Sequence, residues 1–213
     1  MLTTEMNRAI AILSRGCEGI EAVMSSTSES NRFTNALEDL QRLSIENQIP
    51  IAIVGGLAAI RYGYPAATQD IDIAISERDL GTLVHVASRY RFKVVWESKI
   101  GWHTLIHGDV EINVVPEGGR AKDTSPTSIP SPIEMGVISG LDYARIESWV
   151  ELKISSGRQK DRAHIVEVLK KSDQSTIDRI AGHLRQIDES YSLAFRDLLA
   201  EAIEERQQEQ NRR

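Results

Sequence analysis

The segment from Ile51 to Ile75 constrains the fold of this chain more than any other part of the sequence. It opens with Ile51–Val54, a short apolar run of the kind that forms a buried strand. Gly55 and Gly56 then lead into a short helix, and the alternation of acidic and apolar residues in Asp70–Ile75 has the period of a strand with two different faces. The segment therefore predicts two strands joined by a glycine turn and a helix.

The rest of the chain predicts further strands after this segment and helices at both ends. A loop at Pro116–Pro132 is rich in proline and glycine and long enough to be functional or mobile. Strands are expected at Phe92–Trp96, Trp102–His107 and Val110–Val115, the last two as a hairpin around Gly108. Helices are expected at Thr4–Val23, Asn31–Asn47, Leu80–Tyr90, Tyr143–Ser156, Asp161–Lys171, Thr176–Ile187 and from Ser190.

These elements predict an α+β fold, with a mixed, twisted sheet flanked by helices and a helical C-terminal half. We expect three parts: N-terminal helices in residues 1–47, a core in residues 48–132, and a helical region in residues 133–213 that packs on the core. The last residues, roughly ten of them, have no apolar face and are expected to be disordered.

Composition excludes several classes of protein. A formal net charge of −6 argues against a chain that coats nucleic acid non-specifically, although a local basic pocket remains possible. Cys17 is the only cysteine, so an internal disulfide and a cysteine-based zinc site are both excluded. The longest apolar run has about twelve residues, fewer than the roughly twenty of a membrane helix, and no signal-peptide pattern is present. A cytoplasmic protein is expected.

Two carboxylates stand out in the alternating strand. Asp70 and Asp72 point to the same face, and two like charges so close repel each other unless a cation lies between them. Mg²⁺ commonly binds one or two protein carboxylates together with substrate phosphate oxygens. The alternative is an ordinary solvated strand face. Gly55 and Gly56 could bring backbone N–H groups close to a phosphate, or could simply make a tight turn.

A third carboxylate lies in the strand predicted at Val110–Val115. Glu111 shares a strand face with Asn113, and the apolar residues between them form the other face. If this strand is the neighbour of Asp70–Ile75, Glu111 completes a carboxylate triad as a metal ligand or as a general base. Otherwise the strand is merely amphipathic.

Taken together, these motifs resemble the polymerase-beta-like nucleotidyltransferase superfamily, and most closely its AbiEii-type group. The resemblance rests on GGLAAIRYG followed by TQDIDIAI, and on the acidic residue in a later strand. It spans Ile49–Leu169, and it implies a nucleotidyltransferase-fold sheet. Thr68 falls at the family's threonine position and is implied to be part of the nucleotide site.

A fourth stretch, IESWVELKISSGRQKDRAHIVEVLK, resembles the family's later helical segment. There a lysine near the end of one helix is followed by a turn and a Lys-Asp pair. The resemblance implies that Lys153, Arg158 and Lys160 steady the nucleotide by neutralising its phosphates. The alternative is that these cations only decorate a helix end. Asp161 is expected to cap the following helix.

The resemblance implies a metal-dependent nucleotidyltransferase that uses Mg²⁺ or Mn²⁺ and a nucleoside triphosphate. A nucleoside monophosphate would pass to a hydroxyl acceptor, either an RNA 3′ end or a protein side chain. Asp70, Asp72 and Glu111 would be the catalytic residues and metal ligands. A toxin–antitoxin or phage-defence system is the implied setting, with a cognate antitoxin or other protein as a partner.

One position departs from the family pattern and keeps other functions open. Ala66 stands where many members carry arginine, and Arg61 is a candidate substitute. A catalytically inactive protein that binds nucleotide or a partner is the main alternative, and a helical interaction protein is a third. Trp96 and Trp102 flank a strand turn, where packing is the simplest role; stacking of Trp102 on a base is the alternative.

Overall fold

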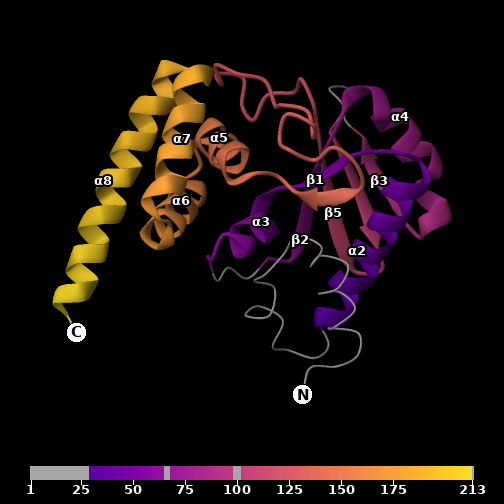
Figure 1. The fold of residues 1–213 in the computed structure, drawn as a ribbon. Helices are drawn as coiled ribbons and strands as arrows, with labels where there is room; N and C mark the ends of the chain where they lie inside the picture. Colours follow the sequence, from indigo (N-terminus) through magenta and orange to yellow (C-terminus); the bar gives the residue numbers. More distant parts are fainter. Residues whose placement is uncertain (1–28, 65–67, 98–101, 213) are drawn as a thin grey trace.

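The computed structural model describes residues 29–64, 68–97 and 102–212. The helix expected at Thr4–Val23 and the departure at Ala66 lie outside these residues, so both stay predictions. Figure 1 shows a sheet with helices on its sides and a C-terminal half that is helical. No described helix combines the length and the apolar character that a bilayer crossing requires.

The described strands form one six-stranded sheet in the order β3-β4-β5-β2-β1-β6. The strands are β1 Ile51–Ile53, β2 Asp70–Ile75, β3 Lys93–Glu97, β4 His103–His107, β5 Val110–Pro116 and β6 Leu141–Tyr143. The β2–β5 and β1–β6 pairs are parallel, and the other three pairs are antiparallel. The predicted mixed sheet of an α+β fold is confirmed, including the β4–β5 hairpin.

The alternation in β2 places its two kinds of side chain on opposite faces of the sheet. Ile71 and Ile73 are fully buried, and they share the main core with Leu40 and Leu43 of helix α2 (Glu29–Glu46). Asp70 and Asp72 therefore point to the other face, which we call the site face. Burial of the isoleucines thus fixes the direction of both carboxylates.

The helices fall into two groups along the chain (Figure 1). Helix α2 packs on the face of the sheet opposite the site face, and α3 and α4 follow β1 and β2. Helices α5 to α8 contact one another and form the C-terminal half. The helices are α2 Glu29–Glu46, α3 Gly55–Arg61, α4 Glu77–Val86, the 3₁₀ helix η2 Ala87–Tyr90, α5 Ile146–Ser156, α6 Gln159–Lys171, α7 Gln174–Ile187 and α8 Glu189–Asn211.

Two regions differ from the expected pattern. A helix was expected from Tyr143, but the chain first forms β6, which pairs with β1, and α5 begins only at Ile146. Disorder was expected for the last residues, but α8 stays helical to Asn211. Its end is stabilised there because Lys170 of α6 forms ion pairs with Glu205 and Glu209.

Asp39 of α2 is a buried charge on the face opposite the site. It accepts hydrogen bonds from Arg91 Nε at 2.6 Å and from His107 Nε2 at 2.7 Å. Burial alone would raise the pKa of Asp39, but these two partners outweigh it and hold the pKa below its usual value. The pairs therefore tie α2 to β4 and to the turn before β3.

Replacing Asp39 with alanine should lower the free energy of unfolding by about 1.5–3 kcal/mol, the usual loss for hydrogen bonds to a charged group. Because the folded pKa is lowered, this contribution is present above the unfolded pKa and is lost as the pH falls through the folded value. Urea denaturation between pH 3 and pH 7 checks both points. Equal stability of the two proteins at pH 7 would contradict the prediction.

Candidate functional site

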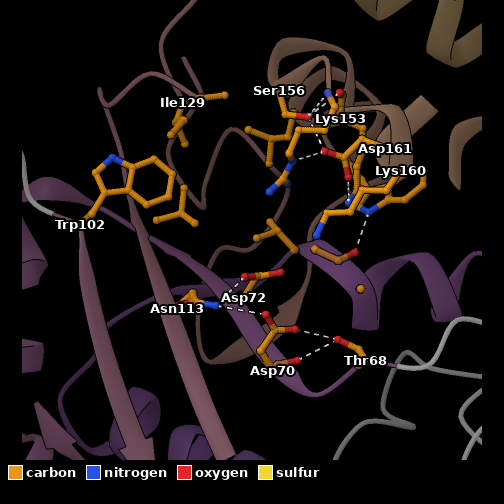
Figure 2. Close-up of a pocket in the computed structure, with 18 of the residues that line it drawn as sticks. Thr68, Asp70, Asp72, Trp102, Asn113, Ile129, Lys153, Ser156, Lys160 and Asp161 are labelled. Carbon is orange, nitrogen blue, oxygen red and sulfur yellow. Dashed lines mark hydrogen bonds and ion pairs between the residues drawn. The ribbon is translucent and has the colours of Figure 1, made fainter. Parts of the chain in front are cut away.

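A cavity of about 690 Å³ lies between the site face of the sheet and helices α5 and α6. Its floor carries Asp70 and Asp72 (Figure 2), and the two glycines that begin α3, called the glycine turn, lie beside them. Of the nine residues predicted to form the site, eight line this cavity, and they come from distant parts of the sequence. They are Gly55, Gly56, Thr68, Asp70, Asp72, Lys153, Arg158 and Lys160.

The glycine turn lies in direct contact with the carboxylate strand. Gly55 has a φ of +62°, and a Cβ atom built on it would lie 1.8 Å from Asp72 Oδ2. A Cβ atom on Gly56 would lie 2.6 Å from Thr68 Oγ1. Trp149 Nε1 of α5 donates a hydrogen bond to the carbonyl oxygen of Gly55 at 3.1 Å, which joins the turn to the C-terminal half. Glycine is therefore required here because Asp72 and Thr68 occupy the space of a side chain.

Replacing Gly55 with alanine should displace Asp72 and lower the free energy of unfolding by at least about 1–3 kcal/mol, the cost of strained backbone. Gly81 of α4 offers a matched control, because a Cβ atom there meets nothing within 4 Å. Gly81→Ala should raise the stability by roughly 0.5–1 kcal/mol. Urea denaturation of both variants measures the contrast, and a Gly55→Ala protein as stable as the parent would refute it.

The two carboxylates are held by neutral donors. Thr68 Oγ1 donates to Asp70 Oδ1 at 2.9 Å, and Asn113 Nδ2 lies 3.3 Å from both Asp70 Oδ2 and Asp72 Oδ1. Burial, and next the charge of Asp70, raise the pKa of Asp72. The pair is therefore short of positive charge, which is the electrostatic situation that a divalent cation relieves.

The predicted third carboxylate lies outside this arrangement. Strand β5 is the parallel neighbour of β2, which meets the condition set for a carboxylate triad, and Glu111 is the Cα partner of Asp70. Its side chain is exposed, however, and it is not among the residues that line the cavity. Asn113, the Cα partner of Asp72, is the β5 residue that contacts both carboxylates. The sequence did carry one signal for this role of Asn113, because Asn113 lies two residues after Glu111 and therefore on the same strand face.

The wall opposite the carboxylates is cationic. Lys153 of α5, Lys160 of α6 and Arg158 between the two helices all line the cavity. Asp161 lies among them, and it accepts hydrogen bonds from Lys153 Nζ at 2.5 Å and from Arg158 Nε at 2.7 Å. These four residues carry three positive charges and one negative charge, and Lys160 forms no ion pair with any described residue.

Asp161 does not cap α6 as expected. It lies in the first turn, where it is fully buried, and Ser156 Oγ also donates to it. Burial would raise the pKa of Asp161, but Lys153, Ser156 and Arg158 outweigh burial and lower it. The carboxylate therefore orders the cationic wall.

Two other charged groups lie away from the site. Arg61, the candidate substitute for the missing arginine, is not among the cavity residues. Carboxylate oxygens of Glu167, Glu205 and Glu209 lie within 4.8 Å of one another, but Lys170 Nζ is 2.9 Å from Glu167 and 3.2 Å from Glu205. Lys170 therefore already occupies the centre of this cluster and offsets part of its negative charge.

No protein-family model matches the sequence, and no curated protein matches it. Among solved structures, the chain is similar to the antibiotic-resistance factor ANT(2'')-Ia in solution, with 13% identity, a TM-score of 0.43, and coverage of 85% of this chain and 98% of that one. The complex of ANT(2'')-Ia with adenylyl-2''-tobramycin gives 14% identity, a TM-score of 0.39, and coverage of 76% and 95%.

The Thermotoga maritima CCA-adding enzyme complexed with tRNA gives 14% identity, a TM-score of 0.40, and coverage of 90% of this chain and 54% of that one. All three matches have identities of 13–14% and TM-scores of 0.43 or below, and none of these structures is described as a member of the AbiEii-type group. Likeness at this level assigns no activity, substrate or partner to the chain.

Proposed function

We propose that the chain is a metal-dependent nucleotidyltransferase that moves a nucleoside monophosphate from a nucleoside triphosphate to a hydroxyl acceptor. One observation carries the proposal: two adjacent carboxylates and three cationic side chains line opposite walls of the same cavity. A triphosphate has the complementary charge for the cationic wall, and a metal–phosphate complex has the complementary charge for the carboxylates. The family resemblance of the glycine turn and of the carboxylate strand supports the same reaction.

The residues present fit a magnesium or manganese ion. Asp70 and Asp72 supply hard oxygen ligands side by side, and burial, followed by the charge of Asp70, raises the pKa of Asp72, which a bound cation would offset. These two carboxylates would hold the ion, which when bound neutralises charge on the phosphate oxygens. Thr68 keeps Asp70 oriented through its hydrogen bond to Oδ1.

The chain's own groups then bind and orient the substrate. Lys160, with Lys153 and Arg158, neutralises the terminal phosphates, and Gly55 and Gly56 let phosphate oxygens approach the backbone. The acceptor oxygen forms a bond to the α-phosphorus, and the bond from that phosphorus to the bridging oxygen breaks. Its electron pair leaves with pyrophosphate, and the hydroxyl proton passes to solvent. Glu111 would join the site only if its exposed side chain turned towards Asp70.

Pyrophosphate release and label transfer from α-³²P-labelled ATP, CTP, GTP and UTP test the proposal. Total RNA and a soluble protein extract serve as acceptors, with Mg²⁺, with Mn²⁺, and after chelation with EDTA. We expect transfer of the label with either metal and none in EDTA. Transfer that persists after EDTA treatment, or triphosphates that do not bind with Mn²⁺ in calorimetry, would reject the proposal.

Asn113 favours a second candidate function, which is nucleotide binding without catalysis. An amide occupies the position between the two carboxylates, and no third carboxylate from β5 lines the cavity within the described part of the chain. Such a protein would act as a regulator or would bind a partner. Tight binding of a triphosphate with Mn²⁺, without pyrophosphate release over all acceptors, would favour this function.

The nature of the acceptor and the cellular setting are further parts of the proposal. An RNA 3′ end and a protein hydroxyl are both compatible with an open cavity of this volume. A role in a toxin–antitoxin or phage-defence system, with a cognate antitoxin as partner, follows only from the sequence resemblance. The labelled product in the transfer assay identifies the acceptor class directly.

A further inference from the structure

One row of side chains crosses the site face from the edge of the sheet to the carboxylates. Trp96 of β3 pairs with Thr104 of β4, Thr104 pairs with Asn113 of β5, and Asn113 pairs with Asp72 of β2. Neighbouring strands lie about 4.8 Å apart, so Trp96 is about 14 Å from Asp72 across the sheet. All four residues line the cavity.

A β-bulge brings Trp96 into this row. The β3–β4 register shifts between Val94 and Trp96, and without the shift Val95 would pair with Thr104. Trp96 would then point to the opposite face of the sheet, because side chains alternate along a strand. The extra residue instead places Trp96 on the site face, where 53% of it is exposed.

Trp102 provides a second planar surface in the same wall. It precedes β4 and, like Val115, packs against a small buried apolar cluster that contains Val54 and Ile129. The remaining side of Trp102 lines the cavity. Figure 2 shows Trp102 and Ile129 on the other side of the carboxylates from Lys153 and Lys160. We call Trp96, Trp102, Thr104 and Ile129 the aromatic wall.

The geometry of phosphoryl transfer assigns a role to each wall. The attacking and leaving oxygens lie roughly in line on opposite sides of the α-phosphorus. If pyrophosphate leaves towards Lys153, Arg158 and Lys160, the acceptor attacks from the aromatic wall. Apart from Asp70 and Asp72, no carboxylate of a described residue lines this side of the cavity, so the wall does not suit a cationic acceptor.

Building on the proposed nucleotidyl transfer, we propose that the aromatic wall is the acceptor subsite and stacks the last bases of a single-stranded nucleic acid. Two indole side chains that line one cavity suit two successive bases, whereas a protein hydroxyl has no use for both. Base–aromatic stacking is tolerant of sequence and commonly strengthens binding on the order of tenfold per base.

The test uses a 5′-fluorescein single-stranded pentaribonucleotide that ends in a 3′-deoxynucleoside, so that it binds without reacting. A matched probe lacks the last two bases but keeps the sugars and phosphates. Fluorescence anisotropy compares both probes on the full chain, on Trp96→Leu and on Trp96→Phe. Ile203→Ala, an exposed change on α8, is the matched control. Calorimetry with Mn²⁺ and a non-hydrolysable ATP analogue runs in parallel.

We expect the complete probe to bind about tenfold more tightly than the probe without bases. Trp96→Leu should remove most of this preference, while Trp96→Phe and Ile203→Ala keep it. Equal binding of the two probes, with normal binding of the ATP analogue, overturns the acceptor subsite alone. Loss of ATP-analogue binding in Trp96→Leu would instead indicate that the base of the triphosphate binds to this wall. That result would also overturn the acceptor subsite. Failure of the parent chain to bind the analogue counts against the proposed function itself.

Discussion

Replacing Asp72 with asparagine should reduce nucleotide transfer at least about 100-fold, because the variant lacks one of the two charged ligands of the ion. A 100-fold loss corresponds to about 2.8 kcal/mol of transition-state stabilisation, since each 1.4 kcal/mol is a factor of ten. The same change should raise the melting temperature of the metal-free protein. Burial and the neighbouring charge of Asp70 raise the pKa of Asp72, so its ionised form is disfavoured in the folded state. The expected variant is thus more stable and less active than the parent.

Because the pKa of Asp72 is raised in the folded state, the stability gained in Asp72→Asn should depend on pH. A carboxyl group with a raised folded pKa favours folding at low pH, and its contribution weakens as the pH rises past the unfolded value of about 3.8. The difference in melting temperature should therefore grow above pH 4. Adding Mn²⁺ should raise the melting temperature of the parent and leave Asp72→Asn nearly unchanged, because the variant lacks one ligand.

Two further variants make the Asp72 result specific. Asp197→Asn removes a carboxylate from α8 that is 71% exposed, and it should change neither activity nor melting temperature. Glu111→Gln should reduce transfer less than tenfold if Glu111 stays outside the cavity as the structure has it. Transfer at the parent rate by Asp72→Asn would remove this residue from the catalytic machinery.

The sequence predicted those features of the fold that are formed by residues close together in the chain. The alternation in β2 and the glycine turn that begins α3 were both found in the sequence, because a strand period and a positive φ depend on neighbouring residues. The three cations of the opposite wall were found through a motif confined to eight residues. Their presence in one cavity is shown, and their roles stay predictions.

Features that depend on pairing between distant segments were missed. Strand β6 has only three residues, too few for a period, and it forms because β1 offers a free edge. Asn113 contacts the carboxylates because of the β2–β5 register, which pairs Asn113 with Asp72 and Glu111 with Asp70. The bulge that turns Trp96 towards the site is likewise a property of the β3–β4 pair. A single sequence carries no direct signal of register.

Asp161→Ala should lower the free energy of unfolding by about 3–5 kcal/mol, the usual cost of removing one partner from a buried ion pair. Lys153 is only 7% exposed and would be left without the carboxylate that now lies 2.5 Å from its Nζ. The lowered pKa of Asp161 means that its contribution is present above the unfolded pKa and is lost as the pH falls through the folded value. Urea denaturation from pH 3 to pH 7 should therefore give a flatter profile for the variant.

A second substitution separates the cost of leaving the Lys153 charge buried and unpaired from the cost of losing the contacts of Asp161. Asp161→Ala combined with Lys153→Met removes both members of the pair, and it should recover much of the stability because no uncompensated charge remains. Triphosphate binding should stay weak in this double variant, since the cationic wall has lost Lys153. If Asp161→Ala alone cost less than about 1 kcal/mol, the pair would behave as an exposed one. The ordering of the cationic wall would then need another source, such as the Trp149 contact to Gly55.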